Sequence, residues 1–201
     1  MEIDVEKTAD RLFPLLSALV TPRPIALVTT ISPNGRVNAA PFSFFNLLGT
    51  EPPIVGVCPG DRDDGTPKDT ALNIRLTHEF VVNLVDEELA VAMNECAAPL
   101  AYGENELDRA GLTPAACSCV KAPRIAEAPA SLECVEWGTL QIGDNRLVIG
   151  LIKRLHVRDS LIDAEALRVS GDAYRPVGRM QGPDWYCRTR DRFELVRPRT
   201  A

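Results

Sequence analysis

Two strand-like stretches separated by a tight turn constrain the fold of this chain more than any other feature. Residues 25–31 (IALVTTI) are rich in β-branched and apolar side chains, and residues 37–42 (VNAAPF) follow the turn SPNG. Such runs favour strands, and Gly35 can take the positive φ that a tight turn between them needs. The sequence therefore predicts a hairpin of these two strands.

Further stretches extend the β structure. Residues 132–142 and 146–157 are expected to be two long strands, because Gly143, Asp144 and Asn145 between them are typical of a hairpin turn. Shorter strands are expected at residues 52–58 and 79–85, and apolar spacing predicts helices at 8–20, 68–77, 87–96 and 104–110. We expect the first helix to cover one end of a barrel.

The 201 residues favour a single domain, residues 1–201, that can bury a real core without staples. Hydrophobic residues make up 45% and charged residues 25%, as in ordinary globular proteins. Strand-dominated segments with hairpin turns predict a mainly β fold, a β-barrel with peripheral helices.

Residues 38–46 (NAAPFSFFN) form the most distinctive stretch. They hold small side chains, a proline, three phenylalanines, and hydroxyl or amide groups, but no nucleophile paired with a base. Ala39, Ala40 and Pro41 would let a flat ligand approach the backbone, while Ser43 and Asn46 would orient it within an apolar wall. Chemistry at such a wall would belong to a bound cofactor.

The helix expected at residues 68–77 begins with Lys68, Asp69 and Thr70. Asp69 or Thr70 is predicted to be the N-cap, because both side chains accept bonds from free backbone N–H groups. A helix N-terminus also attracts anions, and Lys68 stands beside it. Capping and anion binding are both open from the residues alone.

Composition argues against several classes of protein. The formal net charge of -6 and a pI near 5.0 oppose a general nucleic-acid surface. The acidic N-terminus does not resemble a secretory signal, and no run approaches the roughly 18 apolar residues of a membrane span. We therefore expect a cytoplasmic protein that binds neither nucleic acid nor membrane.

The C-terminal region is locally basic, and alternating arginines there would share one face of a strand. A solvated face or a dimer contact is the favoured reading, with a nicotinamide phosphate or nucleic acid as the alternative. The arginines are Arg188, Arg190, Arg192, Arg197 and Arg199.

The six cysteines are scattered, and we interpret most of them as buried thiols rather than disulfides or metal ligands. Cys117 and Cys119 stand one residue apart, and no CxxC pair is present. The acidic loop at residues 59–67 lacks the spacing of an EF-hand and is expected to be solvated. No metal site is predicted.

Motifs of serine hydrolases, zincins, Rossmann folds and P-loops are missing from the sequence. His156 follows a long strand and is a weak candidate for a flavin or nicotinamide contact, while His78 is interpreted as structural. Arg179, between Gly178 and Gly182, is interpreted either as a ligand contact or as a salt-bridge partner.

Taken in series, IALVTT, NAAPFSFFN, the Pro52 and Pro53 pair, KDTALNI and EFVVNLV resemble the flavin reductase-like family of FMN-binding split barrels, which includes flavoredoxins and the reductase components of two-component monooxygenases. The tract PVGRMQGPDWY (176–186) is similar to the family's C-terminal motif. The resemblance implies a six-stranded antiparallel Greek-key split barrel, with a core at about 20–160 and a tract at 170–201 bordering the site or a dimer interface.

The same resemblance implies a homodimer that binds FMN, with Trp185 and Tyr186 near the flavin or at the interface. Lys68, Thr70 and Asn73 correspond to phosphate-binding positions of the family. The full set of implied cofactor contacts is Thr29, Thr30, Asn38, Ala40, Pro41, Ser43, Phe44, Phe45, Asn46, Lys68, Asp69, Thr70, Asn73 and Arg179.

The implied reaction is hydride transfer from NADH or NADPH to the flavin, followed by electron delivery to free flavin, oxygen, or a protein acceptor such as a monooxygenase. FMN would carry the redox chemistry while the protein supplies orientation and electrostatics. The alternative is an FMN-binding electron carrier of flavoredoxin type without substantial reductase activity. Haem or a deazaflavin is a third reading from related split barrels.

Overall fold

The expected hairpin is present in a mainly β fold. A computed structural model describes residues 1–100 and 105–198. Strand β1 (Ala26–Ile31) pairs along its length with β2 (Val37–Phe42), antiparallel, from Ala26 opposite Phe42 to Ile31 opposite Val37. Gly35 has φ +81° in the turn between them, and the Ser32 carbonyl accepts its N–H at 2.9 Å. The first prediction is confirmed.

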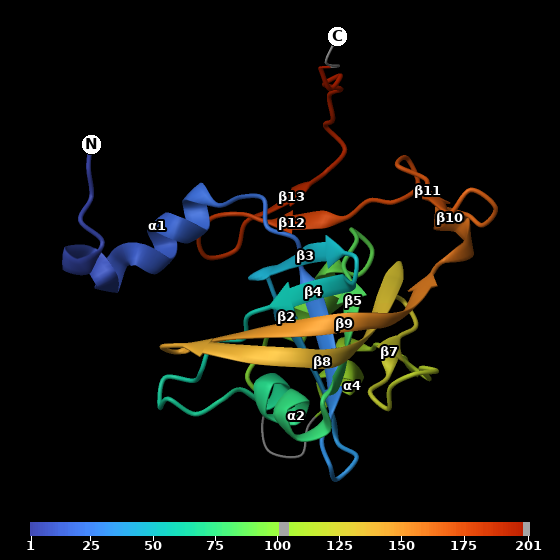
Figure 1. Cartoon of the computed structure of the whole chain (residues 1–201), viewed down its shortest axis with the longest axis horizontal. Coiled ribbons are helices and arrows are strands. Elements are labelled where there is room, and N and C mark those ends of the chain that lie inside the picture. The colour runs from blue at the N-terminus through green and yellow to red at the C-terminus, as the bar shows by residue number, and fades with distance from the viewer. Residues whose placement is uncertain (101–104, 199–201) are drawn as a thin grey trace.

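Seven strands make one antiparallel sheet within the described residues, in the order β2-β1-β5-β8-β9-β4-β3 (Figure 1). The expected barrel class is confirmed, with one strand more than the six expected, because β3 was read only as ligand wall. The long hairpin of β8 and β9 turns at Gly143, whose φ is +56°. The remaining strands are β3 (Phe45–Thr50), β4 (Pro53–Val57), β5 (Glu79–Leu84), β8 (Ala130–Ile142) and β9 (Asn145–Val157).

The sheet curls around an apolar interior. Side chains from six of its strands, together with Ile74 of helix α2 (Asp69–Thr77), pack in one buried cluster. Only Ser43 and Phe44 separate β2 from β3, although these strands are the two edges of the sheet order. The end of one edge strand therefore lies close to the start of the other at this short corner. The cluster comprises Ala26, Val28, Phe42, Val55, Val57, Ile74, Phe80, Val82, Cys134 and Val148.

Short elements surround the sheet. The helix expected at 87–96 is present in shortened form as α3, and the described part of the one expected at 104–110 is α4, since Glu104 lies outside the described residues. Arg199 also lies outside them. The elements are α3 (Ala90–Glu95), α4 (Glu106–Ala110), η2 (Asp159–Leu161), and the paired strands β6 (Pro114–Ala115) with β7 (Arg124–Ile125), β10 (Ile162–Asp163) with β11 (Arg168–Val169), and β12 (Val177–Arg179) with β13 (Tyr186–Arg188).

The N-terminal helix departs from its prediction. A 3-10 helix η1 (Glu6–Arg11) precedes α1 (Leu12–Leu19), and the two project beside the sheet in Figure 1 rather than cover a barrel end. Phe13 and Leu19 are 70% and 71% exposed, so the apolar face of α1 is not buried against the described rest of the chain. Pro14 falls in the first turn, where its missing N–H is tolerated. No helix in the described part of the chain is both long and apolar enough to span a bilayer.

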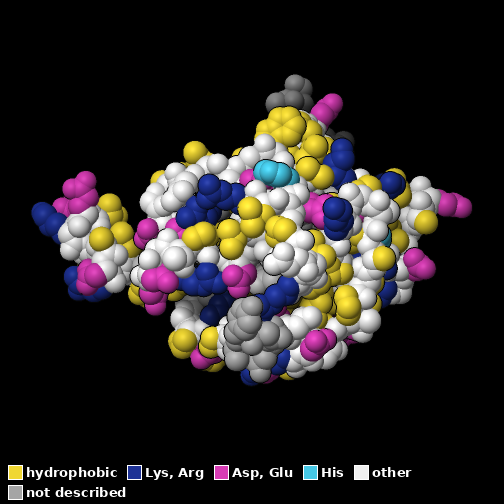
Figure 2. Space-filling model, turned by 90° about the horizontal axis from the view of Figure 1, so that it is seen from below, with side chains coloured by type: hydrophobic (Ala, Val, Ile, Leu, Met, Phe, Trp, Pro, Cys, Tyr) yellow, Lys and Arg dark blue, Asp and Glu magenta, His cyan; other side chains and the backbone are white. Residues whose placement is uncertain are grey.

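Charges of both signs are interspersed over the surface. Figure 2 shows Lys and Arg interleaved with Asp and Glu on one face, without a large patch of one sign. Of the C-terminal arginines that the structure describes, Arg188 alone lies in a strand, so Arg188, Arg190 and Arg192 do not share one strand face. Arg188 and Arg190 both pair with Glu87, at 3.2 and 2.8 Å, and Arg192 pairs with Asp172 at 2.7 Å.

The thiols were predicted correctly as unpaired but not as mostly buried. All six cysteines lie in the described residues and are free. Cys96 and Cys134 are buried, Cys119 is exposed, and the other three are half-buried.

Candidate functional site

Strand β2, at the edge of the sheet, carries the start of the expected ligand wall. The Ala39 N–H points away from β1 and donates to the Glu106 carboxylate at 3.3 Å. Pro41, two residues on, faces the same way because backbone direction alternates along a strand, and it has no N–H to offer. Ala40 and Pro41 are partly exposed. The outer edge of β2 beside Pro41 is therefore small and apolar.

The wall turns a corner at Ser43 and Phe44 and continues along β3. The Phe44 ring is 46% exposed and meets the Phe13 ring edge-on, with centroids 6.3 Å apart. Phe45 packs against the barrel interior instead. Exposed Asn46 accepts a bond from the neighbouring Leu47 N–H at 2.9 Å. Residues 38–46 run along β2 from the turn and into β3, because pairing with β1 begins at Val37.

Arg23 organises this corner, and sequence reasoning missed it. Its side chain is buried, and its guanidinium donates to the carbonyls of Ser17, Val20 and Met180 and to the Ser43 hydroxyl at 3.3 Å. Burial and the charge of Arg179 lower the pKa of Arg23. In the sequence, Arg23 lies between Pro22 and Pro24, and this position was the one local feature that set it apart from other arginines.

The second half of the site is the N-terminus of α2, and its predicted cap is wrong. Lys68 is the N-cap residue and makes no side-chain capping bond. The Asp69 carboxylate forms an ion pair with Arg62, with 2.8 Å between Oδ1 and Nη2. The Thr70 hydroxyl accepts a hydrogen bond from the Asn38 amide at 3.0 Å. Neither side chain accepts a backbone N–H of the first turn. The backbone N–H groups of the first turn of α2 therefore have no side-chain cap.

Buried polar pairs fasten α2 to the first hairpin. Asn73 donates to the Thr30 hydroxyl at 3.0 Å, which parallels the bond between Asn38 and Thr70. The pairs bring together four of the expected cofactor contacts, all at most 9% exposed. Thr29 lies apart from them: its hydroxyl donates to the Pro123 carbonyl at 2.5 Å.

The main chain of Arg179 lies beside that of Arg23, next to the corner at Ser43 and Phe44. Its backbone pairs with that of Arg23 in both directions, at 3.0 and 2.8 Å. Its guanidinium stacks over the Tyr186 ring at 4.6 Å and donates to the Pro183 carbonyl, while Trp185 is 68% exposed. At Gly178, an added Cβ would lie 2.7 Å from the Pro22 Cβ, so glycine permits this close approach.

His156 lies away from the candidate site. Its Nε2 is 2.6 Å from a carboxylate oxygen of Glu133, which is fully buried. Burial alone would raise the pKa of Glu133, but bonds from the Ser118 backbone, His156 and Cys119 outweigh it and lower that pKa to about 2. The sulfur of Cys117 completes a group of three potential ligand atoms within 4.8 Å of one another.

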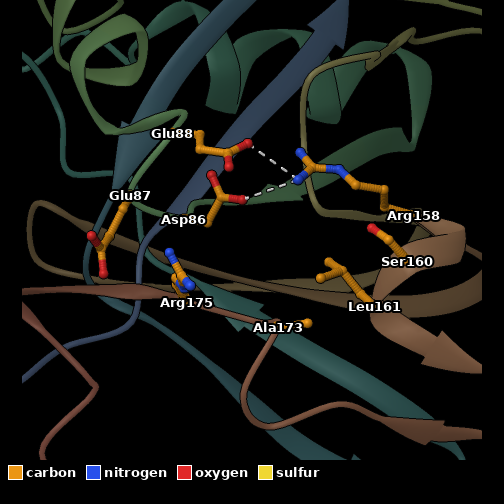
Figure 3. Close-up of a pocket in the computed structure, with 8 residues that line it drawn as sticks. All are labelled: Asp86, Glu87, Glu88, Arg158, Ser160, Leu161, Ala173 and Arg175. Carbon is orange, nitrogen blue, oxygen red and sulfur yellow. Dashed lines mark hydrogen bonds and ion pairs between the residues drawn. The ribbon is translucent and has the colours of Figure 1, made fainter.

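A charged cavity of about 380 Å³ lies elsewhere, beyond the end of β5 (Figure 3). Arg158 reaches across it to Asp86 at 3.7 Å and Glu88 at 3.3 Å. Buried Asp86 also accepts the Leu89 N–H at 3.0 Å. None of the expected flavin contacts lines this cavity, and Asp86, Glu87 and Glu88 are each already paired with an arginine. We therefore assign it no part in the site.

Comparison with known proteins places the chain in a family. A model of the flavin reductase like domain matches residues 18–178. An uncharacterized protein of Deinococcus radiodurans is 46% identical over 190 residues, covering 92% of this chain and 84% of that protein.

Two solved structures are similar over nearly the whole chain. The 2-nitrobenzoate 2-nitroreductase NbaA of Pseudomonas fluorescens has a TM-score of 0.88 at 36% identity, covering 98% of this chain and 96% of that one. Nitrilotriacetate monooxygenase component B of Bacillus cereus has a TM-score of 0.90 at 32% identity, covering 97% and 98%. As the series of motifs indicated, the chain belongs to the flavin reductase-like family.

Proposed function

We propose that the chain binds FMN and acts as an NAD(P)H-dependent flavin reductase. The observation that carries the proposal is the uncapped N-terminus of α2, fastened beside the edge strand β2 by the bond between Asn38 and Thr70. Free N–H groups and the helix dipole favour an anion there. The apolar edge beside Pro41 offers a flat surface for a ring.

The residues present fit a cofactor with a phosphate at one end and a ring at the other. The six residues from Asn38 to Ser43, which are five steps of extended chain, span about 17 Å. Among the described residues, the Lys68 ammonium has no hydrogen bond or ion pair, so it is available to a phosphate. The nearby acids Asp61 and Asp69 are each paired with an arginine.

Bound FMN would supply the redox chemistry, taking a hydride from NADH or NADPH and passing electrons to flavin, oxygen or a protein. The chain's part is to hold and orient it. Lys68 would neutralise the phosphate, Pro41 and Phe44 would pack on the ring, and Ser43 and Asn46 would offer polar contacts. Relatives named a nitroreductase and a monooxygenase component, each above 30% identity, support a redox role.

Absorbance and rapid mixing test the proposal. The purified protein should carry a yellow chromophore or acquire one on adding FMN, and NADH or NADPH should then bleach it on a catalytic timescale. Bleaching by neither nucleotide would make the chain an electron carrier instead. A protein that takes up no FMN would contradict the proposal as a whole.

Removing the charge of Lys68 is expected to weaken FMN binding by about one to two decades. A hydrogen bond to a charged group contributes about 1.5 to 3 kcal/mol, and each decade corresponds to about 1.4 kcal/mol. Lys68→Met keeps the stem of the side chain, so riboflavin, which lacks the phosphate, should bind wild type and variant alike. Flavin fluorescence titration measures both ligands.

Lys153→Met provides the matched control, because Lys153 is exposed on β9 and should leave both affinities unchanged. Equal losses for FMN and riboflavin in Lys68→Met would instead show that Lys68 supports the ring or the fold.

We propose also that the protein is a homodimer. Large apolar side chains of α1 and β3 are exposed around the corner of the site, and such contiguous surfaces mark protein contacts. A partner covering them would close the ring-binding wall, so analytical ultracentrifugation should find the mass of two chains. A monomer at micromolar concentration would contradict this. The side chains are Phe13, Leu16, Leu19, Val20, Phe44, Leu47 and Leu48.

A further inference from the structure

A cavity of about 370 Å³ lies where the start of β8 and the end of β9 meet β7. None of the flavin contacts proposed above lines it. Its size falls in the range of small-molecule pockets. It is lined by Arg124, Ala126, Ala128, Ser131, Leu155, His156, Val157 and Arg158.

Arg124 lines this cavity and carries an unsatisfied donor. Its Nε is buried, and it is the one buried side-chain nitrogen or oxygen among the described residues that has no hydrogen-bond partner. No carboxylate of the described chain forms an ion pair with Arg124 either. A buried donor left unpaired is unfavourable, and in native proteins it calls for a bound water, ion or ligand.

The other two basic side chains of the cavity, His156 and Arg158, are held in place by carboxylates. His156 is bonded to Glu133 at 2.6 Å. Arg158 lies 3.7 Å from Asp86 and 3.3 Å from Glu88 and donates to the Glu127 carbonyl at 2.8 Å. These partners fix the positions of both side chains. Of the three basic side chains of this cavity, Arg124 is the one with no carboxylate partner among the described residues.

A metal ion fits the neighbouring group of Cys117, Glu133 and His156 poorly. The Glu133 oxygens already accept the backbone N–H groups of Ser118, Cys119 and Val120, so few lone pairs remain for a cation. Burial, and then the charge of Glu133, raise the pKa of Cys117 to about 11, which disfavours the thiolate that metals bind.

The geometry points to an anion site: the cavity binds the carboxylate or phosphoryl group of a small organic anion, with Arg124 as its principal contact. The planar guanidinium matches a carboxylate or phosphate through paired N–H donors. Leu155, Val157 and the two alanines give the rest of the ligand an apolar surface. The site would serve a ligand other than the flavin.

Calorimetric titration of the purified protein with benzoate, inorganic phosphate and neutral benzamide tests this inference. Benzoate or phosphate should bind, and Arg124→Gln should weaken that binding about tenfold or more. Arg154→Gln is the matched control, since Arg154 is exposed on the same strand as His156 but does not line the cavity. Flavin affinity should be unchanged in both variants.

Binding of benzoate alone would identify a carboxylate ligand, and binding of phosphate alone a phosphoryl ligand. Three results would overturn the site: neither anion binds, benzamide binds as well as benzoate, or Arg124→Gln and Arg154→Gln lose affinity equally. Amide shifts in the NMR spectrum should be confined to the residues around Arg124 and His156, and shifts centred on α2 would likewise refute the assignment.

Discussion

Replacing Gly150 by alanine is expected to destabilise the protein by about 3 kcal/mol, the upper part of the range for overpacking a core. An added Cβ would lie 2.4 Å from the Phe80 Cζ and 3.2 Å from the Cys134 Cβ. Both side chains are fully buried in the barrel interior, so neither can move aside without displacing others. Urea unfolding measures the loss, and the melting temperature should fall by about 6 to 12 °C.

Gly138→Ala is the matched control, because Gly138 lies on β8 of the same hairpin and an added Cβ there has no atom within 4 Å. Its effect should remain within about 0.5 kcal/mol. Phe80→Leu combined with Gly150→Ala should recover part of the loss, since the two positions are in contact and their effects are coupled. Equal stability of the two alanine variants would show that β9 does not approach Phe80 this closely.

Local signals in the sequence predicted most strands because each hairpin depends on residues close together in the chain. The turn at Gly35 and the turn at Gly143 fix their flanking strands in this way. Nothing local indicates that β2 and β3, adjacent in sequence, become the two edges of one sheet. That arrangement results from pairing between distant strands, such as β4 with β9. The same limit explains why β3 was read as ligand wall.

Site residues were harder to assign because the same side chains suit two roles. Asn38 and Asn73 were expected to contact the cofactor, and the structure engages their amides with Thr70 and Thr30. A hydroxyl or amide can form the same hydrogen bonds with a ligand or with another side chain, and only the tertiary fold decides which of the two it meets. Arg23 was missed for the converse reason, since its partners are backbone carbonyls that leave no pattern in the sequence.

Removing the charge of Glu133 is expected to reduce stability by about 3 kcal/mol at pH 7, because its pKa falls from 4.5 to about 2 on folding and each pKa unit is worth about 1.4 kcal/mol. In Glu133→Gln, the amide group would also turn N–H donors toward the backbone N–H groups of Ser118 and Cys119. Urea unfolding at several pH values measures both effects.

The sign of the pH dependence follows from the direction of that shift. A carboxyl whose pKa is lower in the folded state stabilises the protein fully above its unfolded pKa and loses this contribution as pH falls through its folded pKa. The gap between wild type and Glu133→Gln should therefore be constant from pH 7 to about pH 5 and shrink to less than half by pH 3.

Glu136, a second glutamate on β8 that contacts a histidine, provides the control for Glu133→Gln. Glu136 contacts His78 at 2.7 Å, but that histidine is 69% exposed. Glu136→Gln should lose less than about 1 kcal/mol, because water can replace its exposed histidine partner. A gap for Glu133→Gln that stays constant down to pH 3 would mean that shape, not charge, explains its loss. Residues 118–120 would then be held by packing, and the orientation of His156 toward the Arg124 cavity would not depend on the ionised carboxylate.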